Sequence, residues 1–325
     1  MDFTNIIGHE KIIDNLKKAI DNNQISHSYL FEGEESIGKK MVALSLAKTL
    51  LCKEGGLEPC NRCNSCLKFD NFNHPDFQLI EPEKDIIKKE EIDDMIKSIN
   101  IAPLESSRKI IIIDDSHKMR VEGQNGLLKT LEEPPSYINI ILVAPNKNNL
   151  IPTILSRCQI IPFYPVENKK IEDLLVSQYN KTKEEAKFIA HFTKGSVGRS
   201  IYISQSEDFF QNRDETLSII DGIINGDKLK IFNSTDFFVK NKDIYEEILD
   251  IILYWFRDLI IYKEIGESEL IINMDKISLL SNQSFLNIDK INDIIEKIIE
   301  TRKSIERNVN YQLAIEAMLL SMQEV

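Results

Sequence analysis

Long apolar runs and positive charge are both scarce in this chain of 325 residues. No stretch of about 18 uncharged apolar residues occurs, so we expect no segment that crosses a membrane. The first residues lack the pattern of a secretory signal peptide, which favours a cytoplasmic location. Acidic residues outnumber basic ones by 52 to 40, and the net charge is −12. Such a surface does not attract phosphate backbones in general, so any DNA contact should come through a local patch or through a complex.

Cysteine is also sparse, but its distribution is uneven. Four of the five cysteines lie in one short segment, at Cys52, Cys60, Cys63 and Cys66. In a reducing compartment such a cluster is typical of a metal site rather than of a disulfide framework. Four thiolates can close a tetrahedral site around a structural Zn²⁺, and the polar insertion lacks the apolar residues to order itself otherwise. An iron–sulfur cluster is the alternative, but the C-x₃-C-P element of bacterial ferredoxins is missing.

The segment Gly33–Lys40 has the pattern of a phosphate-binding loop. The apolar run 28–31 before it predicts a strand, and the spacing of 41–51 after it predicts a helix. Backbone N–H groups of such a loop surround an anion, and its lysine, here Lys39, reaches the outer phosphates. The last position of the pattern should carry a Ser or Thr hydroxyl that holds Mg²⁺, but it is Lys40, and an ammonium cannot ligate a cation. The loop therefore has the shape of a nucleotide-binding loop but lacks the residue that would ligate the metal.

A run of four isoleucines, Ile110–Ile113, precedes Asp114 and Asp115. This pattern predicts a buried central strand that presents carboxylates at its C-terminal edge, where a nucleotide would lie. Other strands are expected at 77–80, 138–143 and 159–163. Helices are expected at 11–21, 86–99, 127–133 and 150–155. The alternation of strands and helices argues for a parallel sheet with helices on both faces.

Strand signals stop after Pro162 and Pro165, and the remaining chain has helical patterns only. Helices are expected at 168–178, 183–193 and 197–205. From about residue 209 onward, isoleucine-rich stripes at helical spacing indicate the core faces of a helical bundle.

Several motifs, in this order, resemble those of the bacterial clamp-loader AAA+ proteins. They are Gly33–Lys39, the cysteine cluster, Ile113–His117, Leu127–Pro135 and Ile154–Cys158. The pairing of Leu-Leu-Lys-Thr-Leu-Glu-Glu-Pro with Ser-Arg-Cys is highly specific, whereas the phosphate-binding loop alone would not be. The resemblance runs from about residue 5 to 205 and resumes weakly at 308–313.

The resemblance implies a subunit of three domains. An α/β AAA+ nucleotide-fold domain with a parallel sheet would occupy 1–165, with a zinc module at 52–66. A small helical lid domain would follow at 166–208, and a C-terminal all-α collar domain at 209–325 would join the oligomer. The implied assembly is a hetero-pentameric ring with the delta and tau or gamma subunits of DNA polymerase III. The ring uses ATP to open the sliding clamp and place it on primed DNA during replication.

The implied nucleotide site is only partly intact. Gly33, Gly38 and Lys39 match the family pattern, so binding of ATP or ADP is compatible with the loop. Asp114 is the strand carboxylate that would hold Mg²⁺ through water. Asp115 stands where active members carry a Glu, and a carboxylate withdrawn by about an ångström can lower a rate on the order of a hundredfold.

Two further positions lack the expected side chains. Ala144-Pro145 offers no hydrogen bond to a γ-phosphate, and Gly198 stands where an active relative carries its lid arginine, with Arg199 displaced by one residue. Together with Lys40 and Asp115, these defects predict a ring member without ATPase activity of its own. Polymerase activity would belong to the DNA-directed DNA polymerase III holoenzyme rather than to this chain.

Arg157, in contrast, lies in a complete Ser156-Arg157-Cys158 motif. The resemblance places this arginine at the subunit boundary, as an arginine finger in trans that reaches the γ-phosphate bound by the neighbour. An always-charged, planar donor suits this task, and such fingers contribute about 10³ to 10⁵ in rate.

Two other interpretations stay open from the sequence. The first is an ATP-hydrolysing clamp-loader subunit of the tau or gamma kind, against which Lys40, Asp115 and the missing sensors argue. The second is a nucleotide kinase built on a phosphate-binding loop, which leaves Ser156–Cys158 and the helical C-terminal region unexplained.

Overall fold

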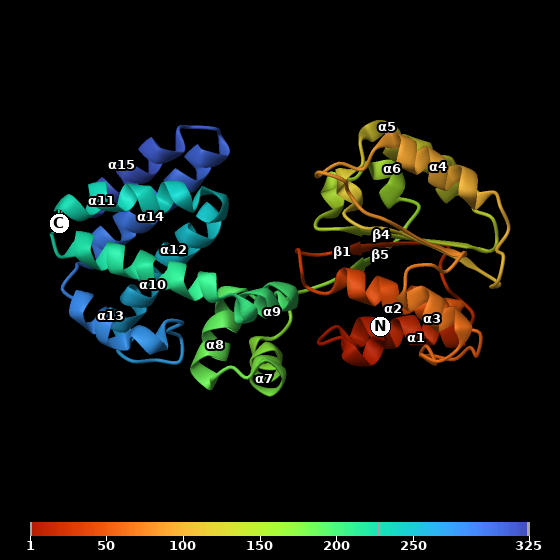
Figure 1. Cartoon of the computed structure of the whole chain (residues 1–325), viewed down its shortest axis with the longest axis horizontal. Helices are drawn as coiled ribbons and strands as arrows, with labels where there is room; N and C mark the ends of the chain where they lie inside the picture. Colours follow the sequence, from red (N-terminus) through yellow and green to blue (C-terminus); the bar gives the residue numbers. More distant parts are fainter. Residues whose placement is uncertain (1, 227, 324–325) are drawn as a thin grey trace. The chain divides into compact units, whose positions relative to one another are not determined.

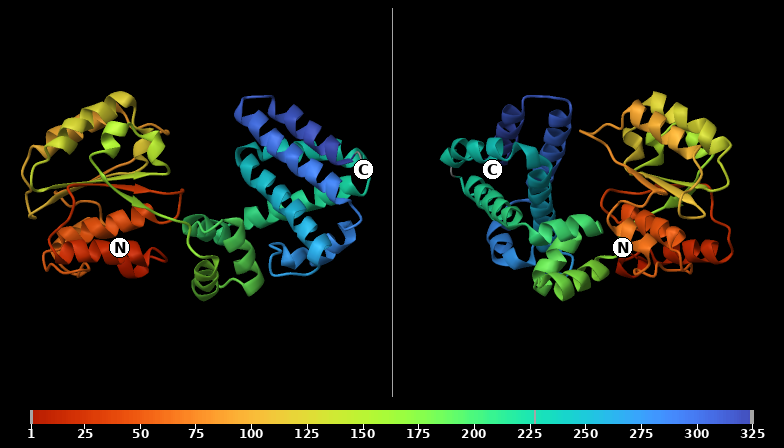
Figure 2. Two further views of the ribbon diagram at one scale, coloured as in Figure 1. Left: turned by 180° about the vertical axis from the view of Figure 1, so that it is seen from behind. Right: turned by 45° about the vertical axis from the view of Figure 1, so that its right-hand side comes forward.

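The computed structural model describes residues 2–226 and 228–323. The chain divides into two compact units, which we describe separately (Figures 1 and 2). The first unit comprises Met1–Ile171 and Thr193–Ser200, and the second comprises Glu172–Phe192 and Ile201–Val325.

The first unit is built on a parallel sheet of five strands in the order β2-β3-β4-β1-β5. The strands are β1 (Ser28–Glu32), β2 (Phe77–Ile80), β3 (Lys109–Ile113), β4 (Ile138–Ala144) and β5 (Gln159–Pro162). Strands β3 and β4 are buried along their whole length, as their runs of isoleucine predict for central strands covered on both faces. The sheet predicted from the alternating pattern is confirmed.

Helices cover both faces of this sheet (Figure 1). Those on one face are α1 (Glu10–Asp21), α2 (Lys39–Leu51) and α3 (Asn64–Asp70). Those on the other are α4 (Lys89–Ile99), α5 (Val121–Glu132) and the short α6 (Pro152–Leu155). The 3₁₀ helices of the unit are η1 (Phe3–Asn5), η2 (Ser116–Lys118) and η3 (Lys147–Asn149).

Alternate residues of each strand contribute to two separate cores. Tyr29 and Phe31 of β1 pack with α1 and α2, whereas Leu30 packs on the other side with residues of α4 and α5. The same alternation divides Ile110 and Ile112 from Ile111 and Ile113, because successive strand side chains point to opposite faces. Each buried isoleucine contributes about 1.5 to 3 kcal/mol to folding.

The rest of the described chain is helical. The elements are α7 (Asn168–Tyr179), α8 (Lys183–Phe192), α9 (Val197–Gln205), α10 (Glu207–Ile224), α11 (Lys228–Lys240), η4 (Lys242–Ile244), α12 (Tyr245–Ile265), η5 (Met274–Lys276), α13 (Ile277–Gln283), α14 (Ile288–Glu306) and α15 (Tyr311–Gln323). Within the second unit the buried Trp255 donates from Nε1 to Gln283 Oε1 at 2.8 Å. The buried Asp258 accepts hydrogen bonds from the backbone N–H groups of Ile272 and Asn273, which ties the segment after α12 to this helix. Among the described helices, none combines the length and apolar composition needed to span a bilayer.

Most predicted elements are confirmed, many with ends shifted by one or two residues, whereas α3 was not predicted and α4 and α5 begin further from their predicted starts. Helix α3 lies inside the insertion that the sequence left without structure, because Cys63 Sγ accepts from the backbone N–H of Cys66 and caps it. Helix α5 begins at Val121 rather than 127, and α4 begins at Lys89 rather than 86. In the latter case Ile87 donates its backbone N–H to Lys118 O instead of entering the helix. The predicted boundaries at 165 and 208 stay a prediction.

Candidate functional site

The phosphate-binding loop joins β1 to α2 at the C-terminal edge of the sheet. Gly33 has φ +152°, and a Cβ there would lie 2.5 Å from Phe163 O. Gly38, at φ +108°, is the N-cap of α2. Both positions therefore require glycine, one for space and the other for its left-handed backbone. The loop has the predicted strand–loop–helix setting.

Lys39 is turned into its own loop. Its Nζ donates to Gly33 O and to Glu34 O, each at 2.5 Å, and the residue is buried. Burial lowers the pKa of Lys39, while the nearby carboxylates of Asp114 and Asp115 oppose this shift. The ammonium that should bind phosphate is thus already satisfied by backbone carbonyls.

Lys40 stands where the loop pattern has a metal-ligating hydroxyl, and it pairs directly with the carboxylate of Asp114. Its Nζ lies 3.0 Å from Asp114 Oδ2 and also pairs with Glu81. Burial lowers the pKa of Lys40, but the hydrogen bonds that it donates to Glu81 and Asp114 outweigh burial and leave the pKa raised. A permanent cation therefore stands beside Asp114, so Mg²⁺ does not fit there in the way the family pattern requires. Glu81, which follows β2, was not predicted.

The other positions that the sequence assigned to the nucleotide site also make contacts within this subunit. Asp115 has φ +46° and pairs with Lys118 at 3.3 Å. After β4, the Asn146 side chain accepts from the backbone N–H of Asn148 and caps η3. The side chains of Ala144 and Pro145 carry no hydrogen-bond donor that could contact a γ-phosphate. These positions provide neither the Glu nor the sensor of a hydrolysing site.

A segment from the helical region, Thr193–Ser200, closes over the loop within the first unit. The backbone N–H of Gly198 donates to Ser36 O at 2.7 Å, and Ser196 Oγ donates to Glu35 O at 3.2 Å. A Cβ at Gly198 would lie 3.0 Å from Ser36 O and 3.1 Å from Ser36 Cβ. The backbone contact therefore occupies the space that a lid arginine at position 198 would need.

His9 is a neighbour of the loop that was not predicted. Its Nε2 donates to Ile37 O at 2.7 Å, and its ring meets that of Phe163 edge-on with 4.8 Å between centroids. Burial lowers the pKa of His9, which favours the neutral ring. A half-open hollow of about 350 Å³ lies beside it, lined by residues 8–12 and by residues between 162 and 170.

Arg157 follows α6, away from the phosphate-binding loop of its own subunit. Its guanidinium donates to Thr153 O at 2.8 Å and to Ser156 Oγ at 3.0 Å, and it pairs with Glu132. The side chain keeps 30% of its surface exposed, so it is not folded into the core. Its backbone carbonyl accepts from Ser28 Oγ at the start of β1, so Arg157 lies at the opposite edge of the sheet from Lys39, whose loop follows the end of β1. Its assignment as a finger stays a prediction.

The four clustered cysteines do come together. The Sγ atoms of Cys52, Cys60, Cys63 and Cys66 all lie within 4.8 Å of one another, and that of Cys60 is 4.0 Å from that of Cys66. Four sulfurs around a tetrahedral zinc would lie about 3.8 Å apart, given Zn–S bonds of about 2.3 Å. Although burial raises it, hydrogen bonds bring the pKa of Cys63 down to about 6, which favours the thiolate that a metal needs. The cluster therefore fits a four-sulfur metal site.

A buried lysine fastens this cysteine module to the sheet domain. Lys48 of α2 donates from Nζ to Asn61 Oδ1 at 2.5 Å and to Asp70 Oδ2 at 2.8 Å. Asn61 lies among the cysteines, and Asp70 ends α3. A lysine on the buried face of an otherwise apolar helix is the sequence signal that could have revealed this contact.

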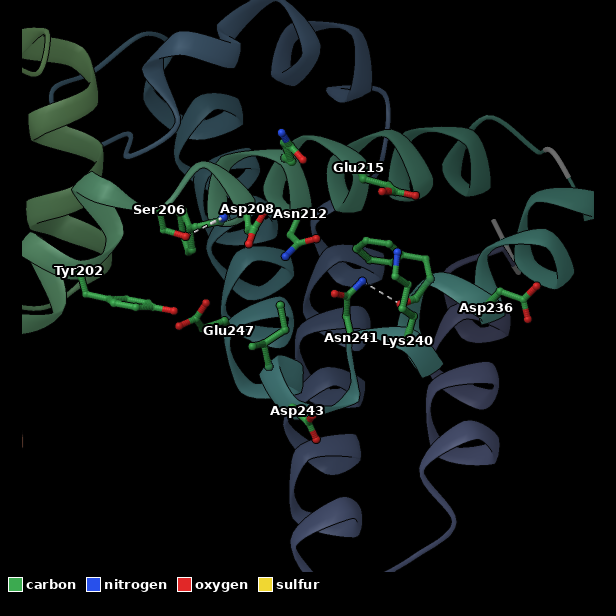
Figure 3. A pocket seen from close by; sticks show the side chains of 14 residues that line it. Tyr202, Ser206, Asp208, Asn212, Glu215, Asp236, Lys240, Asn241, Asp243 and Glu247 are labelled. Atoms are coloured by element: carbon green, nitrogen blue, oxygen red, sulfur yellow. Dashed lines mark hydrogen bonds between the residues drawn. The ribbon is translucent and has the colours of Figure 1, made fainter.

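The second unit contains a separate hollow of about 790 Å³ (Figure 3). Figure 3 shows that its side chains come mainly from α10, from the end of α11 and from the start of α12. Most of its charged lining residues are acidic, namely Asp208, Glu215, Asp236, Asp243 and Glu247, with Lys240 among them. None of the predicted site residues lies there.

Comparisons with known proteins find relatives of nearly the whole chain. A family model described as "DNA polymerase III, delta subunit" matches residues 8–167, and one described as "DNA polymerase III, delta subunit, C terminal" matches 207–324. The chain is 31% identical to DNA polymerase III subunit delta' of Bacillus subtilis, over 97% of this chain and 96% of that protein.

The tau subunits are similar over shorter spans. The tau subunit of Bacillus subtilis is 29% identical over 80% of this chain and 50% of its own length. That of Escherichia coli is 33% identical over 48% of this chain and 24% of its own length. The chain thus spans half or less of these tau proteins, but nearly all of the delta' protein.

Proposed function

Because this chain belongs to the family of DNA polymerase III delta' subunits, we propose that it is a clamp-loader subunit that does not hydrolyse ATP. It would complete a hetero-pentameric ring with delta and tau or gamma in the cytoplasm. That ring would load the sliding clamp on primed DNA. The names of the delta' and tau relatives support these partners.

The observation that carries the proposal is the ion pair of Lys40 with Asp114 and Glu81. It puts an ammonium where a hydrolysing subunit needs Mg²⁺, while Lys39 is held by carbonyls of its own loop. We derive no hydrolytic step at this site, since neither the metal nor a sensor side chain has a place there.

Arg157 would act on the nucleotide of the neighbouring subunit. Its motif is complete, its backbone is fixed at the edge of the sheet, and its side chain is partly exposed. A guanidinium in this position would stabilise the charge that develops on a transferred γ-phosphoryl group. This chain would thus contribute to ATP turnover only through its neighbour.

The cysteine module would hold a structural Zn²⁺. All four positions are filled by protein sulfurs, which leaves none open for a substrate, and this is the arrangement of structural rather than catalytic zinc. The ion would order the polar segment between Cys52 and α3, because metal binding in such modules supplies folding free energy.

The proposal predicts two ATPase results. The isolated chain should release no phosphate above that of its Lys39→Ala variant. A ring rebuilt with Arg157→Ala should assemble normally by size exclusion yet lose clamp- and DNA-stimulated ATPase, by up to about 10³ to 10⁵ at the site that Arg157 faces. Lys39-dependent phosphate release from the isolated chain would contradict the first part, and an unchanged ring rate would contradict the second.

A further inference from the structure

The guanidinium of Arg157 is drawn back onto its own subunit. Besides its contacts with Thr153 O and Ser156 Oγ, it pairs with the carboxylate of Glu132. Glu132 is the last residue of α5, which packs against α6 (Figure 1). A side chain expected to reach a neighbour is therefore held by a carboxylate of its own chain.

The backbone of Arg157 is held by hydrogen bonds on both of its polar groups. Its backbone carbonyl accepts a hydrogen bond from Ser28 Oγ at 2.6 Å, at the start of β1. Its backbone N–H donates to Ile154 O at 3.0 Å. Since both backbone groups are fixed to the sheet domain, the choice between Glu132 and a partner lies in the side-chain torsions.

The held conformation is weakly favoured. The Nε of Arg157 is buried and has no hydrogen-bond partner among the described residues, which disfavours this conformation. The ion pair is partly exposed, with 49% of the Glu132 side chain accessible, so water and salt weaken it. A triphosphate carries several charges and accepts paired hydrogen bonds from a guanidinium, so it would compete well with one exposed carboxylate.

We propose that Glu132 is a positioning residue for Arg157. It holds the guanidinium on its own subunit until a γ-phosphate of the neighbouring site takes its place. This inference rests on the proposed function, in which Arg157 acts in trans. The inference adds that the Glu132 carboxylate binds the Arg157 guanidinium when no triphosphate lies opposite the guanidinium.

The first test uses the isolated chain. Phenylglyoxal labels accessible guanidinium groups, and mass spectrometry of peptides measures the rate at Arg157. We expect Glu132→Gln to raise this rate by about two- to fivefold, the factor that an exposed ion pair corresponds to. Glu133→Gln, the exposed neighbour, is the matched control and should leave the rate unchanged. Equal rates in all three proteins would overturn the contact.

The second test uses the reassembled ring. We expect Glu132→Gln to raise its ATPase rate without clamp and DNA by about two- to fivefold, because the released guanidinium reaches the neighbouring site more often. Glu133→Gln should not do so. The increase should disappear when Arg157→Ala is also present, which a merely structural effect of Glu132 would not produce.

The outcomes separate this inference from the proposed function. If Arg157→Ala leaves the stimulated rate unchanged, the finger itself is refuted, and the role of Glu132 with it. If Arg157→Ala lowers the rate but Glu132→Gln leaves the basal rate unchanged, only the role of Glu132 is refuted. An increase that persists in the double variant would likewise overturn it.

Discussion

At the scale of single residues, the lysines of the phosphate-binding loop have partners within their own subunit: Lys39 donates to carbonyls of the loop, and Lys40 pairs with Asp114 and Glu81. The sequence predicts that Lys40 cannot hold Mg²⁺, and the structure adds what the lysine does instead. Its partner Glu81 comes from the end of another strand, 41 positions away. Local patterns do not predict such a contact, because it depends on which strands become neighbours in the sheet.

Gly198 offers a test of the closed loop. We expect Gly198→Ala to lower the free energy of unfolding by about 1 kcal/mol, because its Cβ would press on Ser36. Gly126→Ala is the matched control, since that glycine also lies in a helix but its Cβ would meet nothing closer than 3.7 Å. The control should stabilise by up to about 1 kcal/mol through helix propensity. Urea denaturation measures the free energy of unfolding of both variants, which should change in opposite directions. A Gly198→Ala variant that is more stable than the unmodified chain would contradict the tight contact with Ser36.

Asp76 gives a prediction about pH. This buried carboxylate accepts hydrogen bonds from the backbone N–H groups of Leu104, Glu105 and Ser106. Burial raises its pKa, but these bonds outweigh it and leave the pKa below 3.8. A lowered pKa means that the contribution of Asp76 to stability is present above about pH 4 and is lost as the pH falls through the folded-state pKa.

The corresponding measurement compares unfolding at several pH values. At neutral pH, Asp76→Asn should lower the free energy of unfolding by about 1 to 3 kcal/mol. The difference from the unmodified chain should shrink below about pH 4. Asp94→Asn, at a largely exposed position, should stay within about 0.5 kcal/mol throughout. A difference that does not depend on pH would refute the assignment.

At the scale of elements, sequence patterns predict strands better than helix ends. The isoleucine runs of β3 and β4 are unambiguous, since both faces of these strands are buried. Helix α5 escapes prediction at its start because Gly123 and Gly126 lower its helix propensity, whereas in the structure Gly123 lies against Ile92 of α4. Helix α3 was not predicted because cysteine is an unusual N-cap residue.

The cysteine module yields a prediction about metal content. The purified chain should carry one zinc ion by elemental analysis, and Cys63→Ser should lose it. Without the ion we expect trypsin to cleave faster at Lys53 and Arg62, because the polar segment then loses its order. Cys158→Ser is the control, and it should keep both the zinc ion and the resistance to trypsin. The visible absorption of an iron–sulfur cluster in the purified chain would overturn the zinc assignment.

At the scale of the whole molecule, net charge limits what the chain can do alone. A charge of −12 opposes the approach of DNA, whose binding depends on neutralised phosphates. We expect the isolated chain to bind primed DNA more weakly than about 10⁻⁴ M at physiological salt, the weak end of non-specific affinities. Fluorescence anisotropy with labelled primed DNA measures this, and the assembled ring is the positive control. Micromolar binding by the chain alone would show a direct DNA site.

The family could be predicted from the sequence because its motifs keep their order along the chain. The division into domains is harder to predict. The segment Thr193–Ser200 lies in the helical part of the sequence but packs with the sheet unit, through the contact of Gly198 with Ser36. Boundaries drawn along a sequence are continuous, whereas compact units need not be.

The bond between Lys40 and Asp114 also has an evolutionary consequence. A back-mutation to threonine at position 40 would leave Asp114 and Glu81 facing each other without a cation, while Lys39 stayed tied to its loop and position 198 stayed blocked. If this site is inactive, as we propose, a single substitution at position 40 would remove the cation from two carboxylates without restoring the other positions. Several coupled changes would then be needed before turnover could arise.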